Sequence, residues 1–239
     1  MRQKNSKTLA VTISAGDRDE LVRQFGSLGT SVPPRTDPKD QLAEEWYCLR
    51  RYLFVLAVEG SLRYPLDVRK SESPDFLLNG QDGAWDGVEI TKATRQEFEA
   101  DLTDLARGKR TRHYISDPAD GVMMLSLAGW AGDSAEREWA EYMLKAIEDK
   151  AAIVSNYKVV RECDLLIYDN TPTPKPDLDS AVEFLRSSLS ARNEQTGFET
   201  GFRTVSLIRD PFVICDVQGA PRFLKYNPEW DAALDPMSA

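Results

Sequence analysis

The sequence predicts an α/β protein in which helices flank one mixed central sheet. Two observations indicate this class and a single domain. Helix-type and strand-type patterns alternate along the 239 residues, and such alternation favours a sheet covered by helices over separate all-α and all-β parts. No linker separates two cores, so we expect a single domain over residues 37–226.

The first part of the chain contains an arm and then a clear helix. Residues 1–36 are expected to be a loosely packed N-terminal arm, because the stretch TSVPPRTDPKD carries prolines that prevent a continuous helix. Residues 40–58 follow with apolar residues at helical spacing, which predicts an amphipathic helix. The apolar stripe of this helix consists of Leu42, Trp46, Leu49, Leu53 and Leu56.

Three strand-type segments follow this helix. They cover residues 62–70, 73–79 and 85–94, and the pairs Asn79-Gly80 and Asp82-Gly83 between the last two are strong turn signals. On the third segment, residues of alternating parity face opposite sides, so Val88 and Ile90 are expected on one face and Glu89 and Thr91 on the other.

The second half continues the alternation. A helix is expected after Asp133, which with Glu136 resembles a capping box. The remaining elements are expected to be a buried strand over 121–129, a strand over 163–169, a helix over 178–190, strands over 203–210 and 211–217, and a loose tail over 227–239.

Composition excludes several classes of function. There is no run of about 18 apolar residues that could span a bilayer, and the N-terminal apolar stretch is too short and broken for a secretory signal. The three cysteines are far apart and form no CxxC pair, which favours reduced thiols in the cytoplasm. One histidine, His113, cannot supply a catalytic triad by itself, and no phosphate-binding glycine motif is present.

Two carboxylates on neighbouring predicted strands are the main chemical signal. Asp75 begins one strand and Glu89 lies in the middle of the next, so the two acids are expected to repel each other. A divalent cation relieves such repulsion, and Mg²⁺ binds through one or two carboxylates together with water and phosphate oxygens. We therefore expect Mg²⁺ or Mn²⁺ bound by Asp75 and Glu89, with the backbone carbonyl near Ile90 as third ligand.

Pro74-Asp75 followed by Glu89 on the next strand, in an α-β-β-β-α-β order, resembles the PD-(D/E)XK nuclease superfamily over roughly residues 38–170. The resemblance implies a restriction-endonuclease-like core and a metal-dependent endonuclease that acts on DNA in prokaryotic defence, restriction or mobile-element processing. It is compatible with a homodimer or with a partner subunit of a larger system. It also implies that a Glu of the first helix lies near the metal, and Glu45, on the flank of the apolar stripe, is the residue that could reach.

The family's lysine is displaced in this chain. The position two residues after Glu89 is Thr91, and Lys92 is predicted on the opposite face of the strand. The helix after Asp133 offers Lys150, which lies on the apolar stripe of Trp139 and Ile147. An ammonium on such a stripe requires an acidic partner or a solvent-filled cleft, so we expect Lys150 to fill the lysine role, with Lys92 as second choice.

The most basic stretch of the chain, RGKRTRHY, lies between these strands and the following one. Because the chain as a whole carries a net charge of −9, a local basic run indicates contact with nucleic-acid phosphates. The residues expected to make this contact are Arg107, Lys109, Arg110 and Arg112.

Each of these interpretations has a purely structural alternative. Asp75 could cap a strand, Glu89 could lie on a solvated edge, Lys150 could extend to solvent, Glu45 could be an ordinary surface residue, and the basic run could be a solvated loop. The alternative for the whole protein is a catalytically inactive member of the same fold that binds nucleic acid or protein. The acidic net charge and Thr91 favour this alternative, whereas the coincidence of Glu45, Asp75, Glu89 and Lys150 favours the nuclease.

Overall fold

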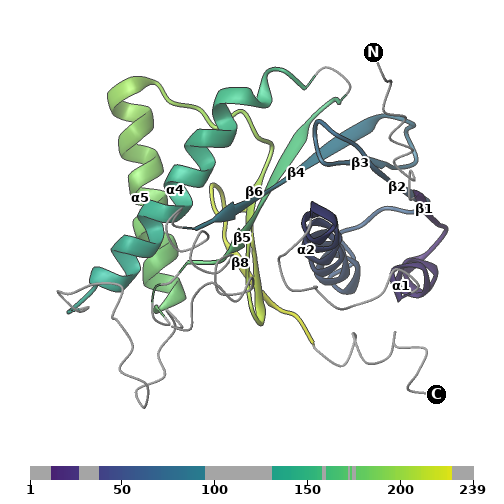
Figure 1. Ribbon diagram of the computed structural model, residues 1–239, viewed down its shortest axis with the longest axis horizontal. Helices are drawn as coiled ribbons and strands as arrows, with labels where there is room; N and C mark the ends of the chain where they lie inside the picture. Colours follow the sequence, from purple (N-terminus) through teal and green to yellow (C-terminus); the bar gives the residue numbers. More distant parts are fainter. Residues whose placement is uncertain are drawn as a thin grey trace.

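One sheet with helices on both faces forms the centre of the molecule (Figure 1). The computed structural model describes residues 12–26, 38–94, 131–157, 160–171, 173 and 176–227. The elements in chain order are β1 (Thr12–Ala15), α1 (Arg18–Gly26), α2 (Pro38–Val58), β2 (Leu66–Lys70), β3 (Phe76–Asn79), β4 (Trp85–Ala93), α4 (Ser134–Val154), β5 (Cys163–Asp169), α5 (Leu178–Thr196), β6 (Val205–Arg209), β7 (Phe212–Cys215) and β8 (Arg222–Lys225).

The eight strands of the described residues are ordered in the sheet as they are in the chain. The pairs β4–β5 and β5–β6 are parallel, and all other pairs are antiparallel. Helices α4 and α5 connect the parallel strands and cover one face of the sheet, whereas α1 and α2 lie on the other (Figure 1). The predicted mixed α/β architecture is therefore confirmed.

Alternation along β4 separates the two cores of the sheet. Val88 and Ile90 pack in the cluster that contains α2 residues such as Leu49. The other face packs α4 against the sheet, with Trp139 and Leu165 fully buried there. Successive residues of β4 thus face different helices. Glu89, next to Val88 in the chain, is on the face that packs against α4.

The N-terminal arm is a correction to the sequence prediction. Residues 12–26 are packed structure: β1 pairs with β2 at one edge of the sheet, and α1 buries Leu21 and Phe25 completely. The Phe25 ring makes edge contacts with Trp46 and Phe54 at centroid distances of 6.0 and 5.7 Å. The prolines that follow do not prevent structure before them, and the last of them, Pro38, is the first residue of α2, a position that proline favours.

The capping box predicted at the start of α4 is also wrong. The side chain of Asp133 makes no capping hydrogen bond and pairs with Arg137 instead. Glu136 accepts a hydrogen bond from the backbone N–H of Asp177 at 2.9 Å, so it stabilises the start of α5. Helix α5, unlike α4, has a side-chain cap: Asp177 accepts hydrogen bonds from the backbone N–H groups of Asp179 and Ser180.

Two further predictions fall on parts of the chain outside the described residues: the strand over 121–129 and the tail beyond Asn227. The structure adds β8, which the sequence reading did not identify. Within the described residues, none of the helices has the length and apolar character needed to cross a membrane.

Candidate active site

Asp75 and Glu89 lie next to each other where β3 begins. Asp75 immediately precedes β3, and its Oδ2 atom accepts a hydrogen bond of 2.8 Å from the backbone N–H of Ile90 on β4. The β3–β4 ladder begins with the pair Phe76–Val88. The bond from Ile90 to the Asp75 side chain lies just beyond this pair and links the two strands there. Asp75 is thereby fixed beside the strand that carries Glu89.

The same bond orients the backbone carbonyl of Ile90. In an extended strand the N–H and C=O of one residue point to the same side. Because the Ile90 N–H points to Asp75, beyond the start of β3, the Ile90 carbonyl also points to this side of β4. This direction is compatible with Ile90 as the third ligand, which stays a prediction.

Lys150 reaches this site from α4. Its Nζ atom donates a hydrogen bond to Oε1 of Glu89, and the two side chains are 24% and 7% exposed. Trp139, Met143 and Ile147 on the same helix are fully buried, so the apolar stripe turns Lys150 towards the sheet. The structure places Lys150 beside Glu89, where the helical spacing predicted it.

Lys70 is a second lysine at the site, which the sequence analysis missed. It is the last residue of β2, and its Nζ lies 2.9 Å from Oε2 of Glu45 and 3.2 Å from Oδ1 of Asp75. Glu45 of α2 also accepts a hydrogen bond of 2.9 Å from Gln41. The only sequence signal for Lys70 is its place at a strand end five residues before Asp75.

Lys92 lies apart from this group of side chains, and the basic run falls outside the residues that the structure describes. The Lys92 ammonium lies 2.8 Å from Oε2 of Glu44, a buried residue of α2. The alternation along β4 thus directs Lys92 to the α2 face, away from Glu89, as expected from the sequence. The four residues expected to bind phosphates, Arg107, Lys109, Arg110 and Arg112, lie outside the described residues.

Burial and charge act together on the titration of Glu89. Burial raises the pKa of Glu89 above its ordinary value, the neighbouring charge of Asp75 raises it further, and Lys150 opposes the increase. The pKa of Tyr157 is raised by burial and then by the charge of Glu89. The charge of Glu89 therefore affects the pKa of Tyr157 in addition to burial.

The raised pKa of Glu89 predicts a dependence of stability on pH. An acid with a higher pKa in the folded than in the unfolded protein stabilises the fold fully below the unfolded pKa, near 4.5, and this contribution is lost as pH rises through the folded pKa. The test is urea unfolding between about pH 4 and about pH 8 with a chelator present. The unfolding free energy of wild type minus that of Glu89→Gln should decrease with rising pH, because Gln does not titrate. A difference that increases would mean that the pairing with Lys150 outweighs burial.

The site contains a pair of possible metal ligands and no larger set. In the described part of the chain, no group of three or more His, Cys, Asp or Glu side chains is arranged to hold a metal ion. Glu45 is paired with Lys70. Two carboxylates and a carbonyl fit an ion such as Mg²⁺, which retains several waters and binds phosphate oxygens. The expected Mg²⁺ or Mn²⁺ at this pair of carboxylates stays a prediction.

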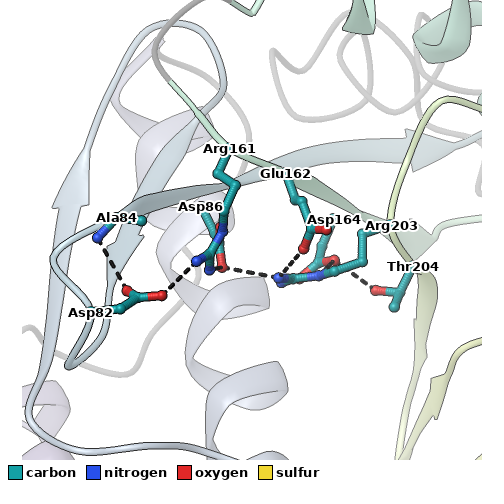
Figure 2. Close-up of polar contacts among 8 residues, drawn as sticks. All are labelled: Asp82, Ala84, Asp86, Arg161, Glu162, Asp164, Arg203 and Thr204. Carbon is teal, nitrogen blue, oxygen red and sulfur yellow. Dashed lines mark hydrogen bonds and ion pairs between the residues drawn. The ribbon is translucent and has the colours of Figure 1, made fainter.

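A second charged cluster lies at the amino ends of β4, β5 and β6, where two arginines share four carboxylates (Figure 2). Arg161 pairs with Asp82 and makes a two-point contact with Asp86 at 3.0 and 2.9 Å. Arg203 makes a two-point contact with Asp164 at 2.9 and 2.6 Å. The cluster joins the β3–β4 turn to the parallel strands, so we assign it a structural role.

Comparison with known proteins gives little information about the family. No family model matches the chain, and no curated protein matches it. A solved structure of a protein of unknown function from Pseudomonas aeruginosa strain PAO1, described as a member of the monooxygenase superfamily, is similar at 18% identity. That match covers 90% of this chain and 89% of the other, with a TM-score of 0.36.

The expected membership of the PD-(D/E)XK superfamily is therefore corrected. The structure that matches is described as a member of a different superfamily, and we do not assign a restriction-endonuclease-like core. The physical reason for the error is the brevity of the motif: one acid at a strand start and another on the next strand can arise in any hairpin that places acids at one end. What the structure itself offers for a function is the arrangement of Asp75, Glu89 and their lysines.

Proposed function

We propose that the protein is a divalent-metal-dependent phosphodiesterase that cleaves DNA. One observation supports this most: Asp75 and Glu89 are adjacent through the Asp75–Ile90 hydrogen bond, and the ammonium of Lys150 is bonded to Glu89. Paired carboxylates beside a partly exposed lysine suit phosphodiester hydrolysis, in which charge develops on phosphate oxygens.

Asp75 and Glu89, with the carbonyl of Ile90, would hold the Mg²⁺ or Mn²⁺. When bound, such an ion polarises the phosphoryl group and lowers the pKa of an attacking water. The backbone N–H of Ile90 keeps the Asp75 carboxylate oriented. The Lys150 ammonium uses one hydrogen on Glu89 and has others available for a phosphate oxygen or for the attacking water.

Nucleic acid is proposed as substrate because of the basic run that contains Arg107, Lys109, Arg110 and Arg112. The three buried free cysteines, Cys48, Cys163 and Cys215, are in keeping with the cytoplasmic location proposed for this activity. A second function, binding without catalysis, is favoured by one specific observation. Both acids already have lysine partners, which neutralise much of the charge that would attract a metal.

Nicking of supercoiled plasmid separates these two functions. Wild-type protein should nick the plasmid with Mg²⁺ or Mn²⁺ and lose this activity in EDTA, because the ion is required for hydrolysis. Asp75→Asn keeps the side-chain shape but removes a charged ligand, and should lower nicking by at least about 10²-fold. Equal nicking by both proteins would assign the activity to a contaminant, and DNA binding without nicking under every condition would support the binding function.

A further inference from the structure

Lys70 occupies a small cage of oxygen atoms beside Asp75. Its Nζ lies 2.9 Å from Oε2 of Glu45, 3.2 Å from Oδ1 of Asp75, 2.9 Å from the carbonyl of Asp75 and 3.0 Å from the carbonyl of Ser71. The ring of Phe76 lies below the ammonium, 4.7 Å from it to the centroid. Two carboxylates from different elements and two carbonyls therefore surround one cation.

This surrounding is more than an ordinary surface ion pair requires. The side chains of Lys70, Glu45 and Asp75 are 12%, 11% and 16% exposed, so their charges are largely shielded from water. An ammonium has three hydrogens to donate, yet four oxygens lie within 3.2 Å of it. Oxygen atoms gathered at this density are the environment that a hard metal cation would use, and here a tethered cation fills it.

Lys70 also leaves Asp75 able to bind an ion on its other side. The Asp75 carboxylate uses Oδ1 for Lys70 and Oδ2 for the N–H of Ile90. A carboxylate offers about four lone-pair positions, so these two contacts leave positions for an ion. Glu45, in contrast, is used by Lys70 and Gln41. A divalent ion between Glu45 and Asp75 would have to displace the ammonium, because like charges at such distances repel strongly.

We propose that Lys70 takes the place of a second divalent ion, so that the site works with a single metal held by Asp75 and Glu89. The inference rests on the proposed function. It assigns Lys70 as a positioning residue that supplies a fixed positive charge through Asp75 and Glu45. It also predicts that removal of this charge opens a second metal site between those two carboxylates and the carbonyls of Ser71 and Asp75.

The test is the number of Mn²⁺ ions bound per chain, measured by calorimetry and by electron paramagnetic resonance of free Mn²⁺. Wild-type protein should bind one ion. Lys70→Gln, which removes the charge but keeps a polar side chain, should bind two, and Lys70→Arg, which keeps the charge, should bind one. Lys92→Gln is the matched control, because Lys92 is also a β-strand lysine paired with an α2 glutamate, and it should stay at one.

The outcomes distinguish this inference from the proposed function. Two ions on wild type, or one ion on a Lys70→Gln variant with an unchanged circular dichroism spectrum, would overturn the role of Lys70 while leaving the phosphodiesterase in place. No ion on wild type but one on Lys70→Gln would overturn the proposed function, and would support the statement that the Lys70 ammonium occupies a metal site. No ion on any of the proteins would overturn both. The wild-type measurement decides the single-metal statement even if Lys70→Gln fails to fold.

Discussion

Lys150→Ala is expected to lower the rate of plasmid cleavage by about 10²–10³-fold, while DNA binding changes little and the protein remains folded. The ammonium is bonded to Glu89 and the Lys150 side chain is 24% exposed, so it can contact Glu89 and a bound phosphate together. Its loss removes a positive charge at the point where negative charge develops in the transition state. The apolar stripe of α4 does not depend on it, because Trp139, Met143 and Ile147 remain buried.

Lys92→Ala provides the matched control for this prediction. Lys92 is paired with Glu44 on the opposite face of β4, so its removal should lower cleavage much less than removal of Lys150. The measurement is the single-turnover cleavage rate at saturating Mn²⁺, with DNA affinity determined separately. If Lys92→Ala lost more activity than Lys150→Ala, the catalytic centre would lie on the α2 face. If neither variant changed a measurable rate, the assignment of a catalytic lysine would be wrong.

The placement of Lys150 illustrates what periodicity can predict. Helix α4 has a regular apolar stripe over many turns, so an angular count from Trp139 and Ile147 is sufficient to direct Lys150 to the sheet. Lys92 was directed to the other face by the same kind of argument on β4. Both predictions depend only on local geometry that a strong pattern enforces.

Lys70 and the N-terminal segment show where such reasoning stops. The partners of Lys70 come from α2 and from the loop before β3, so its role depends on strand register and helix packing rather than on a local pattern. Strand β1 has only four residues and α1 nine, too few to give a periodic signal above chance. The family resemblance failed for a related reason, since two acids at one end of a hairpin are a short pattern that many sheets can contain.

Arg203→Met is expected to destabilise the fold by about 2–3 kcal/mol, a large effect for a residue that is 36% exposed. Arg203 is the two-point partner of Asp164, whose carboxylate is 6% exposed and otherwise accepts from the hydroxyl of Thr204 (Figure 2). Removal of the guanidinium leaves a buried carboxylate without its compensating charge. A fully buried pair would lose about 3–5 kcal/mol, and we expect less here because water reaches Arg203.

Three comparison variants make this prediction specific to the buried carboxylate. Arg161→Met removes the other arginine of the cluster, whose partners Asp82 and Asp86 keep access to solvent or to Arg203, and should have a much smaller effect. Asp164→Asn combined with Arg203→Met removes the uncompensated charge, so the double variant should recover part of the loss measured by urea unfolding. Asp164→Asn alone should cost less than Arg203→Met, because Arg203 keeps Asp86 and Glu162 as partners. Equal destabilisation by Arg161→Met and Arg203→Met would instead mean that the cluster acts through its total charge rather than through Asp164.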